Sequence, residues 1–389
     1  MKSNKVSLFL FIDAMGWELV ERFPHFLASI APVRKRLKTI FGYSSACDPS
    51  IISGLMPSEH GLWSSFYYSP ELSPFRPFQW MKVLPSFIAD NHRVRSRISR
   101  YVASRLEYTG YVQLYNVPFK YLQYFDYAEK KRIYAPNGLP QGRNIFDVMV
   151  EAGIPYHMAA PNTDDLTKIN TAIEQLNKGE ISLAYLTLGQ LDALMHKVGT
   201  THPKVSQLLE WYERHLERIV QTAKQNYEEV SVYVFADHGM HDTIGSFDLQ
   251  KEIIALGLDY GTDYAAMYDS TMARFWYLND RAQERILSKL QDLPVGRVLS
   301  DKELQNLGVF FPDRRYGETI FLLNSSMMIA PSFMGQKQIP GMHGYHPDDA
   351  ESCAAMLSNQ ELPEELHSIH HIFNIMQSEL QIKQLITPS

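Results

Sequence analysis

The chain has 389 residues, of which 45% are hydrophobic and 21% charged, and its formal net charge at pH 7 is −6. This length is enough for one large α/β core with smaller insertions, or for two domains. The negative charge gives no basis for nonspecific binding to acidic polymers, so we expect no nucleic acid polymer as a partner. No segment approaches the roughly 20 apolar residues of a membrane span. The two cysteines, Cys47 and Cys353, do not form a disulfide framework.

The first apolar segment, residues 6–12, follows Lys2 and Lys5 and superficially resembles a signal peptide. It is only about seven residues long, has no small-residue cleavage site and ends at Asp13. The segment therefore predicts the first strand of the core, and we expect a cytoplasmic protein.

Further apolar strand candidates at 154–159, 181–188 and 230–236 alternate with helical patterns. The clearest helix follows Pro203, where apolar residues recur at three- and four-residue spacing. This alternation predicts an α/β fold with a mostly parallel sheet covered by helices on both faces. In such sheets ligands bind beyond the carboxyl ends of the strands.

Four short segments place acidic or imidazole groups after apolar runs: Asp13, Asp192 with His196, Asp237 with His238, and His343. Any one segment is weak evidence, because an Asp at a strand end commonly caps a helix and a lone His is commonly a core residue. Together the six groups could hold two divalent ions about 4 Å apart, at roughly three ligands per ion. The order and spacing of these segments along the chain are the stronger evidence for a metal site.

The motifs appear in a fixed order along the chain. They are a strand ending at Asp13, a hydroxyl at Ser44 ten residues before Gly54, a Ser-Gly-Leu-Met-Pro-Ser-Glu-His-Gly run at 53–61, an Asp-x-x-x-His pair at 192–196, an Asp-His-Gly-Met run at 237–240, and His343-Gly344. This set resembles the alkaline phosphatase superfamily, in particular its nucleotide pyrophosphatase/phosphodiesterase branch.

The resemblance implies one alkaline-phosphatase-like catalytic domain over 1–389, with a cap insertion at 66–140 and a second insertion at 241–335. It implies the following ligands: Asp192, His196 and His343 on one ion, and Asp13, Asp237 and His238 on the other, with Ser44 bridging toward the second. The mixed Asp/His set favours zinc, with manganese as the alternative.

Ser44 is the expected nucleophile. A serine hydroxyl is a poor nucleophile at neutral pH, and metal coordination is one way to lower its pKa. Asp48 and Pro49 predict the N-cap and first residue of a short helix that reaches Met56, which places Ser44 near the positive end of the helix dipole. Ser45 and Ser50 are rival nucleophiles.

The resemblance implies a metal-dependent phosphodiesterase or nucleotide pyrophosphatase that acts through a serine phospho-enzyme on a small phosphorylated substrate, such as a nucleotide or nucleotide sugar. The alternatives are a phosphomonoesterase or other phosphoryl-transfer enzyme, and a binding protein without chemistry, although no ligand or nucleophile is missing. A sulfatase is disfavoured because Asp48 stands where its motif has Arg. Many phosphodiesterases of this branch carry an Asn about 21 residues after the nucleophile, where this chain has Ser65.

Two stretches contain candidate phosphate-binding arginines. Residues 66–132 are rich in aromatic residues and include Arg93, Arg95, Arg97, Arg100 and Arg105. We favour a satellite core with a solvated arginine face over a cap in which aromatic residues stack on a substrate and an arginine pairs with phosphate. Arg274, just before a predicted strand at 275–278, is more consistent with a structural ion pair than with a substrate contact.

Overall fold

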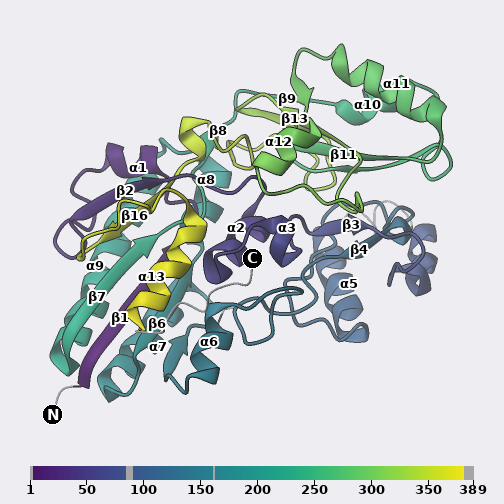
Figure 1. Cartoon of the computed structure of the whole chain (residues 1–389). Coiled ribbons are helices and arrows are strands. Elements are labelled where there is room, and N and C mark those ends of the chain that lie inside the picture. Colours follow the sequence, from purple (N-terminus) through teal and green to yellow (C-terminus); the bar gives the residue numbers. More distant parts are fainter. Residues whose placement is uncertain (1–2, 85–90, 161–162, 381–389) are drawn as a thin grey trace.

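The computed structural model describes residues 3–84, 91–160 and 163–380, and it forms a mixed α/β fold (Figure 1). The central sheet has six strands in the order β2-β16-β7-β1-β6-β5. These strands are β1 (Ser3–Ile12), β2 (Val33–Leu37), β5 (Tyr156–Met158), β6 (Leu183–Leu188), β7 (Tyr227–Phe235) and β16 (Ala354–Ser358). Strands β7, β1, β6 and β5 run parallel, whereas β16 is antiparallel to both of its neighbours. The predicted, mostly parallel sheet is confirmed.

The central strands are apolar on both faces, as a sheet covered by helices requires. Strand β1 pairs with β6 and β7 in a register that places Phe11 beside Thr187 and Phe235. The strands predicted at 6–12, 181–188 and 230–236 correspond to β1, β6 and β7, and the one at 154–159 is the shorter β5. Since β1, β6 and β7 are parallel neighbours, their carboxyl ends meet at one edge.

Helices cover both faces of this sheet (Figure 1). Helices α7 (Asp165–Lys178) and α9 (Pro203–Asn226) pack together over β6 and β7, and the predicted apolar stripe of α9 is buried. Across the other face lies α13 (Ile372–Glu379), whose Glu379 accepts hydrogen bonds from Ser7 of β1 and Tyr233 of β7. The remaining helices of this part are α1 (Trp17–Arg22), α2 (Ser44–Ser53), α3 (Pro57–His60), α6 (Ile145–Glu151), α8 (Gln190–Val198) and the 3₁₀ turns η3 (Ala350–Ser352) and η4 (Ile369–His371).

A second sheet of four antiparallel strands, in the order β10-β11-β13-β12, lies beside the first. Its strands are β10 (Tyr264–Tyr268), β11 (Met272–Tyr277), β12 (Gly296–Val298) and β13 (Thr319–Leu323). Its accompanying helices are α10 (Leu249–Ile254), α11 (Asp280–Gln291) and α12 (Asp301–Asn306).

This second sheet shares a hydrophobic core with the aromatic-rich segment that follows α3. The core joins Phe66, Phe75 and Phe125 to Phe275 and Trp276. The elements of that segment are β3 (Phe66–Tyr68), η1 (Arg76–Val83), α5 (His92–Arg105), η2 (Leu122–Tyr124) and β4 (Phe125–Tyr127). The interpretation of these aromatic residues as a satellite core is therefore confirmed, whereas the boundaries of the two insertions stay predictions.

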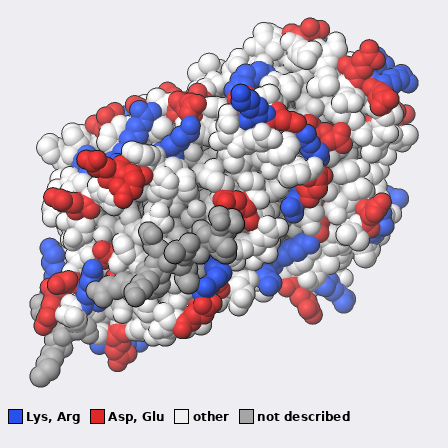
Figure 2. All heavy atoms as spheres, viewed as in Figure 1, with Lys and Arg blue, Asp and Glu red and all other residues white. Residues whose placement is uncertain are grey.

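Short strand pairs close the loops around the core: β8 (His241–Asp242) with β15 (Gly341–Met342), and β9 (Gly245–Phe247) with β14 (Met327–Ile329). On the face seen in Figure 2, acidic and basic side chains are interspersed, which agrees with the small net charge.

Within the described ranges, none of the helices combines the length and the apolar character needed to cross a bilayer.

Candidate active site

The six expected metal ligands come together beyond the carboxyl ends of the central strands. Asp13 directly follows β1, the helix α8 that carries Asp192 and His196 follows β6, and Asp237 and His238 directly follow β7. His343 directly follows the short strand β15, which packs against α8. Because neighbouring parallel strands end at the same edge, segments more than 200 residues apart meet there.

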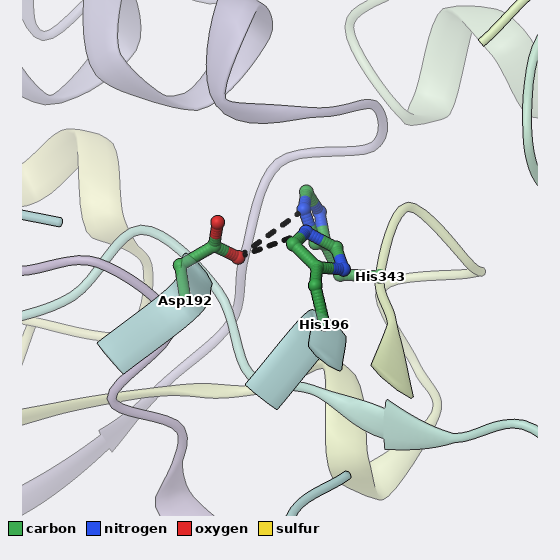
Figure 3. A group of neighbouring side chains, drawn as sticks. All are labelled: Asp192, His196 and His343. Atoms are coloured by element: carbon green, nitrogen blue, oxygen red, sulfur yellow. Dashed lines mark ion pairs between the residues drawn. The ribbon is translucent and has the colours of Figure 1, made fainter. Parts of the chain in front are cut away.

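The first group contains Asp192, His196 and His343 (Figure 3). The Oδ1 atom of Asp192 lies 3.2 Å from Nε2 of His196 and 3.6 Å from Nε2 of His343. Asp192 and His196 are four residues apart on α8, so they share one face of the helix. The Nδ1–H of His196 donates to the carbonyl of Gly341 at 2.8 Å. That bond fixes the tautomer and leaves Nε2 free to bind a metal.

The second group contains Asp13, Asp237 and His238. Nε2 of His238 lies 2.9 Å from Oδ2 of Asp237 and 3.7 Å from Oδ1 of Asp13. The Nδ1–H of His238 donates to the carbonyl of Gly239 at 2.9 Å, so here too Nε2 faces the carboxylates. The two groups adjoin, because the rings of His238 and His343 stack with their centroids 3.7 Å apart.

Ligand atoms of two overlapping triads, Asp192–His196–His343 and Asp13–Asp192–His238, each lie within 4.8 Å of one another. Asp192 thus stands between the two groups. The expected ligands of the second ion also include Asp237, whose Oδ1 accepts the N–H of Ala14 at 3.3 Å while Oδ2 faces His238.

The buried carboxylates of the two ligand groups would be stabilised by positive charge placed between them. Buried oxygens of Asp13, Asp192 and Asp237 have no hydrogen-bond partner. Burial, together with the carboxylates of Asp237 and Asp192, raises the pKa of Asp13 well above its usual range. Burial alone would lower the pKa of His238, but the neighbouring carboxylate of Asp237 outweighs it and raises that pKa to about 9. Crowded carboxylates with unpartnered oxygens beside oriented imidazoles fit divalent cations.

Ser44 lies next to the second group. It is the first residue of α2, and its Oγ lies 3.3 Å from Nε2 of His238. The prediction that Asp48 caps this helix is wrong: the helix begins at Ser44, five residues before the predicted first residue Pro49, with Tyr43 as the N-cap. Asp48 lies within the helix and accepts a hydrogen bond from the Tyr134 hydroxyl at 2.7 Å. The earlier start places Ser44 directly at the positive end of the helix dipole.

The two rival serines make structural hydrogen bonds. Ser45 Oγ donates to the carbonyl of Trp63 at 3.3 Å, and buried Ser50 Oγ donates back to the carbonyl of Ala46 at 3.0 Å. Among these three serines, Ser44 is the one whose hydroxyl contacts an expected metal ligand.

His60 was not expected to have a role in the site, yet it supports the helix that carries Ser44. Its Nε2 lies 3.0 Å from Ser50 Oγ, and its Nδ1 accepts the N–H of Leu62 at 3.2 Å. Burial lowers the pKa of His60 to about 3, so the ring is neutral. The signal for this role was present in the Pro-x-x-His-Gly run, whose histidine follows Ser50 by ten residues.

A cavity of about 870 Å³ opens over the ligands and Ser44. Its volume lies in the range of sites for small molecules. On the side of the aromatic-rich insertion it is lined by Ser65, by Arg100 of α5 and by residues of the segment after α5: Tyr111, Tyr115, Glu129, Arg132 and Tyr134. The segment expected to form a cap thus supplies part of the cavity wall.

Arg274 is fully buried and makes a structural ion pair, which was the favoured interpretation. Its Nε donates to Asp269 Oδ2 at 2.8 Å, and its two terminal nitrogens donate to the carbonyl of Phe66 at 2.8 Å and to Ser64 Oγ at 2.9 Å. Every nitrogen therefore has a protein acceptor, and the side chain joins β11 to the segment before β3.

The arginines of α5 divide by environment. Arg93, Arg97 and Arg105 are exposed, as expected for a solvated face, and Arg100 is exposed at the cavity wall. Arg95 is buried and donates to the carbonyls of Tyr115 at 2.7 Å and Val117 at 3.0 Å.

Comparison with known protein families identifies the family to which the chain belongs. The model of the type I phosphodiesterase / nucleotide pyrophosphatase family matches residues 7–346, well over half of the chain and all of the motifs from Asp13 to His343. The chain belongs to this family. As a type I phosphodiesterase / nucleotide pyrophosphatase, it is a hydrolase of phosphoric ester or phosphoanhydride bonds within the alkaline phosphatase superfamily.

Solved structures of this family share its fold. Murine ectonucleotide pyrophosphatase / phosphodiesterase 5 matches with a TM-score of 0.70 and 14% identity over 99% of this chain and 97% of that chain. The human protein of the same name matches with a TM-score of 0.69 and 14% identity over the same shares. An inactive variant of the murine protein, in complex with AMP, gives 0.69 and 14% identity over 100% of this chain and 97% of that chain. No curated protein sequence matches the chain.

Proposed function

We propose that the chain is a two-metal phosphodiesterase or nucleotide pyrophosphatase that acts through a phospho-enzyme on Ser44. The observation that carries the proposal is the position of Ser44 Oγ, 3.3 Å from His238 and at the edge of a group of buried, unpartnered carboxylate oxygens. A hydroxyl in that place can share a cation with the second ligand group.

In the proposed metal centre, Asp192, His196 and His343 hold one ion. Asp13, Asp237 and His238 hold the other, with Ser44 as a further ligand. The mixture of carboxylate and imidazole ligands favours zinc over magnesium, with manganese as the alternative. When bound, such ions lower the pKa of a coordinated hydroxyl and neutralise charge on phosphoryl oxygens.

Ser44 is the group of the chain that would form a covalent bond. Its Oγ attacks phosphorus, the bond from phosphorus to the leaving oxygen breaks, and the proton of the hydroxyl is released to solvent. Water then attacks the phosphoserine from the opposite side and restores the hydroxyl. The N-terminus of α2 favours both the alkoxide and the incoming phosphate, because its unpaired N–H groups carry partial positive charge.

The cavity supports a diester or a pyrophosphate as substrate. Two buried cations beside the cavity already have partners: Lys168, which lines it, donates to the carbonyl of Thr187 at 2.6 Å, and Arg274 is paired with Asp269, which also lines it. A monoester carries one more anionic oxygen, which these groups do not meet. The tyrosines on the cavity wall offer an apolar surface for a second organic group, such as a nucleoside or a nucleotide sugar.

A phosphomonoesterase is the second candidate. Arg100 and Arg132 line the cavity, and either guanidinium would supply a cation for the additional oxygen of a monoester if it turned toward Ser44.

The deciding experiment measures activity together with metal content. The purified protein is stripped with a chelator, reloaded with zinc or manganese, and assayed with an aryl phosphodiester and a nucleotide sugar. We expect activity only after reloading, near two equivalents of metal, and a trapped phosphate on Ser44 by mass spectrometry. Full activity in excess chelator, or a label on another residue, would contradict the proposal.

A further inference from the structure

The 3₁₀ helix η1 presents three rows of side chains, because residues three apart in such a helix lie above one another. One row, with Phe78 and Met81, is buried in the core that η1 shares with the second sheet. Another row is apolar but open to solvent, with Trp80 54% and Val83 74% exposed. Large apolar side chains that lie together on a surface, unlike single ones, commonly mark a binding site for another molecule.

The third row of η1 is basic. Arg76 and Lys82 are exposed, with Gln79 between them, and the helix contains no acidic residue. The two exposed rows run side by side, so the solvent face of η1 combines apolar and positively charged groups. This combination is typical of segments that lie in the headgroup region of a bilayer, with their apolar side chains toward the acyl chains.

Helix α5 adds positive charge beside η1. Arg93, Arg97 and Arg100 are exposed, and their four- and three-residue spacing places them on one face of the helix. This helix also contains no acidic residue. The ring of Tyr101 meets the ring of Phe78 edge-on, with 6.2 Å between the centroids, so the two helices adjoin.

The exposed basic side chains of η1 and α5 differ in their pairing from others on the surface. Among the described residues, no carboxylate forms an ion pair with them. Elsewhere such pairs form, as between Arg143 and Glu151 or between Arg297 and Glu303. The chain as a whole has a net charge of −6, so this surface departs locally from the charge of the protein.

We propose that the surface of η1 and α5 binds the headgroup region of a bilayer that contains anionic lipids. We call it the η1–α5 surface, and it consists of Arg76, Trp80, Lys82, Val83, Arg93 and Arg97. The indole of Trp80 lies at the level of the headgroups, where tryptophan is enriched in membrane proteins. The basic side chains attract the anionic headgroups.

Charge complementarity favours this partner over others. In a symmetric dimer the η1–α5 surface would face itself, and its positive charges would repel one another. A nucleic acid or an acidic protein would meet the charges but gives the exposed apolar row no apolar layer to enter. An anionic bilayer offers both, because its charged headgroups lie directly above its acyl chains.

Helix α5 also connects the η1–α5 surface to the cavity over the candidate metal ligands, since Arg100 and Ala103 line that cavity. A protein docked through this surface holds the cavity near the boundary between lipid and water. The six residues of the η1–α5 surface are not part of the cavity wall. The proposal therefore does not depend on the proposed phosphodiesterase function, and its test measures binding alone.

The first test is co-sedimentation of the full chain with vesicles of phosphatidylcholine alone and of equal parts phosphatidylcholine and phosphatidylserine. We expect binding to the mixed vesicles to be at least about tenfold tighter. We also expect it to weaken as the ionic strength rises, because salt screens the attraction to the headgroups. Equal binding to the two kinds of vesicle, or binding to neither, would contradict the proposal.

Two double variants test the two halves of the surface. We expect Trp80→Ser with Val83→Ser to weaken binding to the mixed vesicles at least about tenfold, because the apolar row is lost. We expect Arg93→Gln with Arg97→Gln to weaken it by a similar factor of at least about ten, because two charges are lost. Wild-type affinity in both double variants would remove these residues from the contact.

The matched controls remove exposed side chains of the same kinds elsewhere. They are Ile254→Ser at the end of α10, and Arg281→Gln with Arg285→Gln on α11. We expect these variants to bind the mixed vesicles like the wild type. Unchanged thermal midpoints show that each variant is folded.

The fluorescence of Trp80 reports the contact directly, because the other four tryptophans are buried or half-buried. On addition of mixed vesicles we expect the emission to shift to shorter wavelength, and we expect lipids brominated on their acyl chains to quench it. Trp80→Phe should lose both effects. A shift and quenching that persist in Trp80→Phe would place the contact in another region, and the proposal would be wrong.

Two other results would assign the surface to a different partner. If the wild type is a dimer, Trp80→Ser with Val83→Ser makes it a monomer and neither protein binds vesicles, the surface joins two copies of the chain. If that double variant binds both mixed vesicles and heparin as tightly as the wild type does, the basic side chains act alone as a site for polyanions. Either result overturns the membrane proposal and leaves the proposed phosphodiesterase function untouched.

Discussion

Ser44 Oγ lies 3.3 Å from Nε2 of His238, although the two residues are separated by 194 positions in the sequence. The contact joins the first residue of α2 to the loop after β7. Since the other ring nitrogen of His238 donates to the carbonyl of Gly239, the imidazole can present Nε2 to a cation beside the serine. This relationship distinguishes Ser44 from its two neighbouring serines.

Removal of the Ser44 hydroxyl tests that distinction. We expect Ser44→Ala to lower turnover at least about a hundredfold, because the covalent step is lost, while the fold and most of the metal content remain. The control is Ser45→Ala, which removes only a hydrogen bond to the carbonyl of Trp63. If Ser50→Ala were inactive and Ser44→Ala active, the nucleophile would be Ser50 and the assignment to Ser44 would be wrong.

Removal of one ligand tests the metal centre. In His343→Ala the first ligand group keeps only Asp192 and His196, and we expect the bound metal to fall from about two equivalents to about one, with activity reduced at least about tenfold. Metal analysis after dialysis measures this loss, and His215→Ala, at a half-buried position of α9 outside the ligand groups, is the matched control. Retention of both equivalents in His343→Ala would remove this residue from the ligand set.

Substrate preference tests the assignment of diester against monoester. We expect kcat/KM for an aryl phosphodiester or a nucleotide pyrophosphate to exceed that for the matching monoester by at least about tenfold, a difference of about 1.4 kcal/mol in transition-state binding. The physical reason is that Lys168 and Arg274 already have protein partners. A preference for the monoester at the same pH and metal content would favour the second candidate function.

Arg274 provides a test of stability. In Arg274→Met the buried carboxylate of Asp269 loses its partner, and we expect the free energy of unfolding to fall by about 3–5 kcal/mol, measured in urea. The matched control is Arg297→Met, which breaks the partly exposed pair with Glu303 and should cost at most about 1 kcal/mol. If Arg274→Met kept its stability and only raised KM, Arg274 would be a substrate contact instead.

His60 predicts a dependence of stability on pH. Its pKa is about 3 in the folded protein and about 6.5 in an unfolded chain. Between these values the unfolded state binds the additional proton, so stability falls as the pH drops below about 6.5, by up to about 1.4 kcal/mol per pH unit. Urea midpoints at pH 7.5 and 5, in excess chelator, should show a larger loss for the wild type than for His60→Gln. Equal losses in the two proteins would mean that His60 is not the group responsible.

Much of the fold and of the candidate metal site was predictable from the sequence, because the information is local. An apolar run that ends in Asp13, and another that ends in Asp237 and His238, each indicate a buried strand followed by polar groups at its carboxyl end. Parallel neighbours end at one edge, so the convergence of these groups follows from the strand pattern alone. The spacing between Ser44 and Gly54 indicated the proposed nucleophile through the family resemblance.

Other features depended on contacts between distant segments, which local patterns do not encode. The start of α2 at Ser44 rather than near Asp48 is one case, because Asp48 is engaged by Tyr134, 86 residues away. The burial of Arg274 against Asp269 and the segment before β3 is another, and a guanidinium has the same sequence signal whether it meets substrate or protein. The left-handed conformation of Tyr115 arises from Arg95 and the neighbouring insertion. The sequence alone therefore determined which groups we propose for the chemistry, and the tertiary packing decided which side chains hold them, because burial and long-range hydrogen bonds exist only in the folded chain.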